Sequence, residues 1–415
     1  MVDSMKLHLE NMGPINEANI NIDKITIVGG HNSTGKSTLS KFLYSFLRSN
    51  SFNRQEIAYE SIINLMSRES RYIRRIFKKY NIEFRYPLYL LKNADNFERI
   101  LDKYGDMKNF IYESEIPEDD FNEIKFRLDV IEDLIRIVDE DSYELYISLM
   151  RTLLESEFSS NHFNSFIDIN NDFIIDFKNY EFEDDDAFKF NNDIIVNDIF
   201  YIDSVSVLDT FEQERFFDRK SIEHLDFLKK NLTNKTKDVF DKKINKNILS
   251  IEKEISNIIN GKFFYERGEF KFVSNDNIKS NMSNTASGTK QIGLIQLLLA
   301  NRKLKENSFL IIDEPEVNLH PDWQYKLAKI LVLLAKRLNI SVYINTHSPL
   351  FIESIHAFSD YYGILDKTTY HLAESAKNNL FDINEVDENN LSEIYSNLGQ
   401  PYIDIDILRL EKDLD

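Results

Sequence analysis

Hydrophobic and polar positions follow two patterns along this chain, one typical of strands and one typical of helices. Near the N-terminus, short apolar runs predict three strands, at Met5–Leu9, Ala18–Ile22 and Lys24–Val28, with a turn over residues 11–16 between the first two. Apolar residues then recur every three or four positions from Lys36 to Leu47, which predicts a helix. The N-terminal segment therefore ends in a strand, a short turn and a helix.

A long central stretch interrupts this pattern. Residues 54–192 are rich in Asp, Glu, Asn, Phe and Tyr, and helical spacing within them predicts a mainly helical insertion. The positions that carry this prediction are Ile124, Leu128, Ile131, Leu134, Ile135 and Val138. Strands resume with an apolar run that starts near Asp193.

Strands and helices alternate again in the second half of the chain, which is typical of an α/β fold. The elements predicted there are a Lys-rich amphipathic helix over Lys235–Asn260, a helix over Ile292–Ala300, a buried strand over Phe309–Ile312, a helix over Trp323–Leu338 and a strand over Ser341–Asn345. The predicted domain organisation is an N-terminal core segment (1–53), the insertion (54–192), a second core segment (193–375) and a C-terminal tail (376–415).

Composition excludes several classes of protein. The 415 residues suffice for two or three domains, and a hydrophobic fraction of 42% is ordinary for a globular protein. Because the chain has no cysteine, disulfides, cysteine-based zinc sites and cysteine nucleophiles are excluded. No apolar run has the length of a membrane span and no signal-peptide pattern is present, so we expect a cytoplasmic protein without a membrane partner.

Charge is distributed unevenly along the chain. The net charge is −20, and residues 113–198 alone hold 25 Asp and Glu against 6 Lys and Arg, a net charge of −19. A basic strip over Arg68–Arg85 precedes this acidic segment and has two interpretations: a contact for a phosphate backbone, or a solvated helix face that pairs with the acidic residues. Within the acidic segment, Asp184–Asp186 lack a defined ligand spacing, and we predict a loop there without a metal.

The residues from Gly30 to Ser37 carry the clearest chemical signal. Gly30, four spacers, Gly35, Lys36 and Ser37 match a phosphate-binding loop, in which backbone N–H groups surround a phosphate, the lysine adds a charge and the Ser hydroxyl binds Mg²⁺. A helix N-terminus at this point also favours an anion. The residues expected to contact ATP are Gly30, His31, Asn32, Ser33, Thr34, Gly35, Lys36, Ser37 and Thr38.

A second set of polar residues follows the buried strand at Phe309–Ile312. In a parallel sheet such a strand delivers Asp313 and Glu314 to the carboxyl edge, where ligands bind. Asp313 is the expected second Mg²⁺ ligand beside Ser37. Glu314 is expected to orient or deprotonate the water that attacks the γ-phosphate.

Three further motifs make the chain resemble the ABC-type ATPases. Ser287–Gln291 is similar to the signature loop of that family, Pro315–Pro321 fills the position of its D-loop, and Thr346-His347-Ser348-Pro349 resembles its switch histidine. The resemblance implies a mixed sheet flanked by helices, with an antiparallel N-terminal part. It also implies a head-to-tail dimer in which Ser287 and Gly288 of one subunit cap the γ-phosphate held by Lys36 of the other, with Glu314, His347 and Lys36 as the catalytic residues.

Within this group, the Asp-Glu-Pro-Glu and Thr-His-Ser-Pro motifs resemble the branch of SMC-like repair ATPases, OLD-family ATPases and stand-alone ATPases of anti-phage systems such as Septu and PARIS. The chain departs from several of these relatives. It has no zinc-hook Cys-x-x-Cys, and nothing after Asp404-Ile405-Asp406 is long enough to complete a Toprim nuclease, so we assign that pair no function. The Q-loop glutamine of the family is not placed, with Gln55 and Gln213 as candidates.

These features together predict an ATP hydrolase that uses Mg²⁺ and acts as a homodimer or higher oligomer. By resemblance, closure of the dimer regulates a separately encoded effector, a nuclease or toxin, in anti-phage defence. One alternative is a DNA-maintenance ATPase that contacts DNA through Arg68–Arg85 or Lys235–Lys246. The other is a scaffold in which ATP binding alone is the switch.

Overall fold

The computed structural model describes residues 5–51, 54–84, 97–139, 143–158, 166–169, 173–176, 196–203, 222–233, 246–281, 285–388 and 390–412. The chain divides into two compact units, one formed by Met1–Phe52 with Glu155–Asp415 and the other by Asn53–Leu154. No helix in these ranges is long and apolar enough to cross a membrane.

A mixed sheet forms the centre of the first unit, with the strand order β5-β4-β1-β2-β13-β12-β3-β11-β10-β6 among the described residues. Its strands are β1 Met5–Met12, β2 Ile15–Ile22, β3 Ile25–Gly30, β4 Phe166–Ile169, β5 Phe173–Asp176, β6 Ile199–Ile202, β10 Phe309–Asp313, β11 Ser341–Thr346, β12 Thr368–Ser375 and β13 Phe381–Val386. Strands β6, β10, β11, β3 and β12 run parallel, whereas β1 and β2 form an antiparallel hairpin. The predicted α/β fold class, with its antiparallel N-terminal part, is confirmed.

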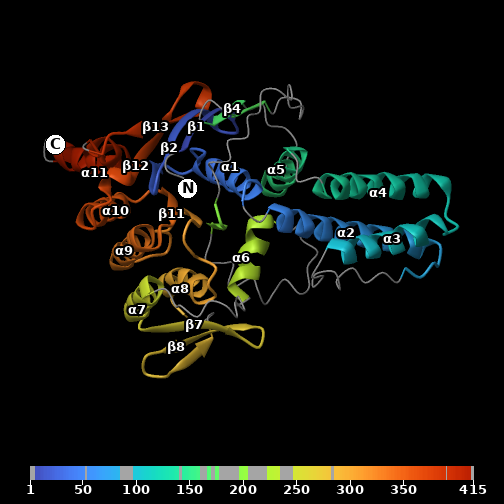
Figure 1. Cartoon of the computed structure of the whole chain (residues 1–415). Coiled ribbons are helices and arrows are strands. Elements are labelled where there is room, and N and C mark those ends of the chain that lie inside the picture. The colour runs from blue at the N-terminus through green and yellow to red at the C-terminus, as the bar shows by residue number, and fades with distance from the viewer. Residues whose placement is uncertain are drawn as a thin grey trace. The chain divides into compact units, whose positions relative to one another are not determined.

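Helices cover both faces of this sheet (Figure 1). They are α1 Lys36–Ser49, α6 Glu223–Thr233, α7 Lys246–Ile258, α8 Ser287–Ala300, α9 Pro321–Leu338, α10 Pro349–Tyr361 and α11 Ser392–Lys412. Leu310 and Ile312 of β10 point into a core built with α7 to α11. The alternate residues Phe309, Ile311 and Asp313 point to the opposite face, because successive side chains of a strand alternate. That face carries α1, whose Ser40 is hydrogen-bonded to Asn345 of the next strand.

The structure extends or shifts several predicted elements. The hairpin strands β1 and β2 are longer than predicted, so their turn narrows to Gly13 and Pro14. Helix α8 begins at Ser287 rather than Ile292, because Ser, Gly and Thr fit a first helical turn even though they add no apolar periodicity. Helix α9 begins at Pro321, with proline at the position where its missing N–H costs nothing. The helix predicted over Lys235–Asn260 is described as α7 from Lys246 onward.

Residues 376–415, predicted as a C-terminal tail, contain part of the central sheet. Strand β13 lies between β2 and β12, and its residue Ile383 is fully buried. Helix α11 follows and packs Ile394 into the main core beside β3. The second half of the chain also contains a separate small sheet that the sequence patterns did not predict, formed by β7 Gly261–Glu266, β8 Glu269–Ser274 and β9 Lys279–Asn281.

The second unit is helical within its described residues. It contains α2 Arg54–Lys79, α3 Phe97–Tyr112, α4 Glu118–Asp139 and the first part of α5 Tyr143–Phe158. The helices α2, α3 and α4 share one apolar core, centred on residues such as Phe77, Met107 and Leu128. The unit ends at Leu154, whereas the predicted insertion extends to residue 192, because β4 pairs with β1 of the large sheet.

Candidate functional site

The phosphate-binding loop connects the end of β3 to the start of α1. Gly35 has a left-handed backbone with φ of 93°, and a Cβ atom there would lie 2.6 Å from Cγ1 of Ile15, so only glycine fits. No side chain caps the N-terminus of α1, which leaves the N–H groups of its first turn without a side-chain acceptor. The local backbone is therefore suited to hold an anion.

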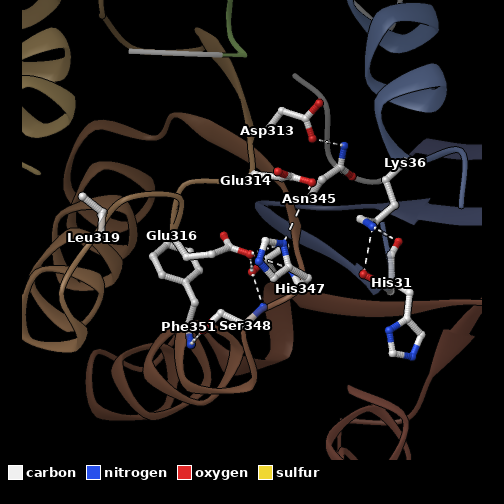
Figure 2. Close-up of polar contacts among 12 residues, drawn as sticks. His31, Lys36, Asp313, Glu314, Glu316, Leu319, Asn345, His347, Ser348 and Phe351 are labelled. Atoms are coloured by element: carbon white, nitrogen blue, oxygen red, sulfur yellow. Dashed lines mark hydrogen bonds and ion pairs between the residues drawn. The ribbon is translucent and has the colours of Figure 1, made fainter. Parts of the chain in front are cut away.

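Lys36 lies on the inner side of this loop and is buried. Its Nζ donates hydrogen bonds to the carbonyl oxygens of Gly30 (2.8 Å) and His31 (2.5 Å), as Figure 2 shows for the latter. To contact a phosphate, the ammonium group must exchange these carbonyl acceptors for phosphate oxygens.

The other predicted loop residues divide by exposure. His31, Asn32, Ser33 and Ser37 are exposed, and Thr38 is half-buried. Thr34 is buried and donates its hydroxyl to the carbonyl oxygen of His31 at 2.9 Å, which closes the loop from inside.

Asp313 ends strand β10 and lies on the face of the sheet that carries α1. Its Oδ1 accepts a hydrogen bond from Nδ2 of Asn345 at 3.0 Å, and its Oδ2 accepts one from the hydroxyl of Tyr201 at 3.1 Å. The two partners come from the strands on either side of β10. The carboxylate is therefore fixed in orientation by both neighbours.

Glu314 follows in a strained conformation. Its φ of 47° lies in the left-handed region, which is unusual for a residue other than glycine or asparagine. The backbone N–H donates to the carbonyl oxygen of Asn345 at 2.9 Å, which holds this turn against β11. The side chain is 35% exposed, so its carboxylate can meet a solvent-borne ligand.

Glu316 is a site residue that the sequence motifs do not indicate. It is buried, and its Oε1 accepts hydrogen bonds from the hydroxyl of Thr346 (2.7 Å) and from the backbone N–H of His347 (2.6 Å). Nδ1 of His347 also lies 3.2 Å from that oxygen and 3.9 Å from Oε1 of Glu314 (Figure 2). The only available signal was its place two residues after Glu314, within the D-loop motif.

The loop and the carboxylates influence one another electrostatically. Burial lowers the pKa of Lys36, and the negative charges of Glu314, Asp313 and Glu316 oppose that effect without cancelling it. Residues almost 280 positions apart in the chain thus form one site, because β3 and β10 flank β11 in the sheet.

The residues present fit a Mg²⁺ ion that is shared with a nucleotide. Mg²⁺ prefers oxygen ligands and is usually held by one or two protein groups together with phosphates and water. Asp313 and Ser37 offer a carboxylate and an exposed hydroxyl of this kind. Among the described residues, no cluster of three or more His, Cys, Asp or Glu side chains could cage a metal alone.

The signature-like residues lie at the start of α8. A Cβ atom on Gly288 would lie 3.1 Å from Leu319 and 3.2 Å from Trp323, so this glycine allows α8 to approach the D-loop closely. Ser287 is the first residue of α8. Within one chain, the atoms nearest Gly288 therefore belong to the D-loop and α9.

The remaining candidates fall elsewhere. Gln55 lies in α2, and Asp404 and Asp406 lie in α11, while Gln213 and Asp184–Asp186 are outside the described residues. Of the basic helix segment at Lys235–Lys246, the structure describes Lys246 alone.

Comparison with known proteins gives one family match. A family model described as an AAA ATPase domain matches residues 5–352. No curated protein matches the chain.

Several solved structures are similar over most of their length. The SMC head domain from Thermotoga maritima is 12% identical with a TM-score of 0.37, covering 92% of this chain and 99% of that one. The bacterial ABC transporter cassette MJ0796 is 11% identical with a TM-score of 0.30, covering 88% and 94%. Because these identities and TM-scores are low, the assignment of the chain to a family depends on the family model.

Proposed function

The chain belongs to the AAA ATPase domain family, and we propose that it binds ATP with Mg²⁺ and hydrolyses it at a site shared between two subunits. The observation that carries this proposal is geometric: Lys36, which follows β3, and the carboxylates of Asp313, Glu314 and Glu316, at the end of β10, meet across β11 (Figure 2). A lysine on a phosphate-binding loop that faces paired carboxylates at a strand end has the parts that phosphoryl transfer requires.

Each side chain has a separable task in this proposal. Lys36 and the first-turn N–H groups of α1 bind the β- and γ-phosphates, and Ser37 and Asp313 hold Mg²⁺, which neutralises charge on the phosphates. Glu314, whose side chain is 35% exposed, accepts a proton from the attacking water. His347 lies within 3.9 Å of Glu314 and senses the γ-phosphate.

The second half of the proposal concerns the partner subunit. Gly288 packs against Leu319 of its own D-loop, and we assign Ser287 and Gly288 to the nucleotide of another copy, as the resemblance to ABC-type ATPases implies. Two nucleotides would then hold a head-to-tail homodimer together. Following the Septu-like and PARIS-like resemblance of the Asp-Glu-Pro-Glu and Thr-His-Ser-Pro motifs, we assign dimer closure to the control of a separate nuclease or toxin effector in anti-phage defence.

ATP binding is tested by replacing Lys36 with alanine and measuring the affinity for ATP by calorimetry. We expect binding to be lost, because no other described cation lies inside the loop. Lys336→Ala is the matched control, since Lys336 is an exposed lysine of α9 that donates to the carbonyl of Gly363. Equal affinities in both variants would remove the loop from the proposed function.

The shared site is tested by complementation. Lys36→Ala subunits are mixed with Ser287→Arg subunits, each inactive alone. If one subunit supplies the phosphate loop and the other the signature residues, the mixture forms an intact site and recovers part of the ATPase rate. A mixture as inactive as its components would show that each chain holds its own complete site.

One observation favours DNA binding as a second candidate function. Arg74, Arg75 and Lys78 are exposed on α2, and their spacing of one, three and four residues places them on one helix surface. Elsewhere in the basic strip, Lys79 lies 3.6 Å from Asp120, so part of it pairs with acidic neighbours. If the remaining cations bind a phosphate backbone, DNA affinity falls steeply with salt and this dependence weakens in Arg74→Glu/Arg75→Glu. Absence of salt-dependent binding would exclude this function.

A further inference from the structure

Two ionisable residues are buried together outside the predicted ATP site. Glu157, near the end of α5, and His224, in the first turn of α6, are 4% and 2% exposed. Nδ1 of His224 lies 2.6 Å from Oε2 of Glu157, and its Nε2 lies 3.3 Å from Oδ2 of Asp203. Burying such a pair is costly unless its geometry is satisfied, and motif reasoning assigns it no role.

The pair also anchors the start of α6. The backbone N–H of His224 donates to Oε1 of Glu157 at 3.2 Å, and the N–H of Glu223 donates to the hydroxyl of Ser156 at 2.9 Å. The end of α5 thus supplies acceptors for the first N–H groups of α6. In the chain, α5 begins in the second unit and its last residues, from Glu155, belong to the first.

The imidazole of His224 contacts strand β6. Its ring centroid lies 4.5 Å from that of Tyr201, and Tyr44 of α1 closes the same cluster, 6.1 Å from Tyr201 and 5.9 Å from His224. The Tyr201 ring is therefore confined on two sides. Its hydroxyl donates to Oδ2 of Asp313 at 3.1 Å.

We propose that Glu157, His224 and Tyr201 are positioning residues that orient the Asp313 carboxylate for Mg²⁺, linking the metal side of the ATP site to the point where the chain returns from the second unit. The inference depends on the proposed function, since Asp313 must bind the metal. Removing a group that hydrogen-bonds to a metal ligand typically lowers metal affinity by about 10–100-fold.

The decisive variant is Tyr201→Phe, which removes the hydroxyl and keeps the ring. The matched control is Tyr343→Phe: Tyr343 lies on β11, pairs with the same residue of β10 as Tyr201, and its buried hydroxyl makes no hydrogen bond to Asp313. We expect Tyr201→Phe to need about tenfold more Mg²⁺ for half-maximal ATP binding, with metal-free ATP binding unchanged. Tyr343→Phe should resemble the wild type.

A second measurement tests the link to α5 by hydrogen exchange of the backbone. In the wild type, adding Mg²⁺ with ATP should slow exchange over residues 222–233, which include the His224 N–H bonded to Glu157. Tyr201→Phe should lose this response at saturating Mg²⁺ and ATP, whereas Tyr343→Phe should keep it.

The outcomes separate three failures. If the wild type binds no ATP with Mg²⁺, the proposed function fails. If the wild type binds and Tyr201→Phe equals Tyr343→Phe in both measurements, Tyr201 does not position Asp313 and the inference is overturned. If Tyr201→Phe shifts the Mg²⁺ dependence but leaves the exchange response intact, the link to α5 is refuted.

Discussion

A histidine in the centre of the sheet makes stability depend on acid in a specific way. His371 of β12 is fully buried, and its Nε2 accepts the backbone N–H of Asn21 at 3.0 Å. Burial lowers the pKa of His371 from 6.5 to about 4. Protonation would place a buried charge there and remove the acceptor that Asn21 needs.

Proton linkage gives the direction and the size of this effect on the unfolding free energy. Between pH 6.5 and about 4, the unfolded chain binds a proton at this residue and the folded chain does not, so folding becomes less favourable as the pH falls. The gap between these two pKa values corresponds to about 3 kcal/mol of unfolding free energy. Stability should be lost progressively across that window and be unaffected by His371 above it.

The assay is urea unfolding of the wild type and of His371→Gln at several pH values. Trp323, the only tryptophan, packs against the main core and reports on unfolding of the first unit through its fluorescence. The glutamine side chain can still accept a hydrogen bond and does not titrate. The two proteins contain the same acidic residues, so the difference between the two pH profiles isolates His371. Parallel profiles between pH 6.5 and 4 would refute this reasoning.

Three further predictions concern the site and its surroundings. Burial alone lowers the pKa of His224, but hydrogen bonds and charges of Asp203 and Glu157 raise it to about 9. The stabilisation from protonated His224 is therefore full below pH 6.5 and is lost as the pH rises through 9. In urea unfolding, the difference in unfolding free energy between the wild type and His224→Gln should change by about 3 kcal/mol across that window. Glu316→Ala leaves the Thr346 hydroxyl and the His347 N–H without their acceptor and should lower the unfolding free energy by about 3 kcal/mol. Glu316→Gln should retain most of the wild-type stability, and similar losses in both variants would contradict the assigned contacts. Glu314→Gln should accumulate ATP-bound dimers on size-exclusion chromatography, and turnover at the wild-type rate would remove Glu314 from the mechanism.

Sequence patterns predicted the central α/β core because its strands are short apolar runs joined to amphipathic helices. The helix after the phosphate loop was predicted to start at Lys36, where α1 starts, and the strand at Ser341 matches β11. Strand β13 was missed, since Phe381–Val386 is half polar and breaks strict alternation at Asn384 and Glu385. Its position is decided by tertiary pairing with β2, more than 350 residues earlier, and with the neighbouring β12.

The residues of the candidate site also differ in whether the sequence could predict them. Lys36, Asp313 and Glu314 could be found because glycine spacing and strand ends leave local signals. Glu316 leaves only its place in the D-loop motif and Tyr201 leaves no signal, because a lone glutamate after a proline or a tyrosine in a strand is common. Their roles come from distances between residues far apart in the chain, such as the 112 positions that separate Tyr201 from Asp313.

Residues outside the motifs fix the orientation of the motif residues Asp313 and Glu314. Asp313 has both carboxylate oxygens occupied by neighbours from flanking strands, and Glu314 keeps a left-handed backbone because its N–H is bonded to Asn345. Such a conformation costs free energy of about 1–3 kcal/mol and persists only where the surroundings enforce it. Asn345 bonds to Asp313 through its side chain and to Glu314 through its carbonyl, so it couples the metal ligand to the proposed base. Asn345→Ala keeps the carbonyl that accepts the Glu314 N–H and removes the side-chain bond to Asp313, so it should raise the Mg²⁺ concentration needed for half-maximal ATP binding, and an unchanged Mg²⁺ dependence would contradict this role of Asn345.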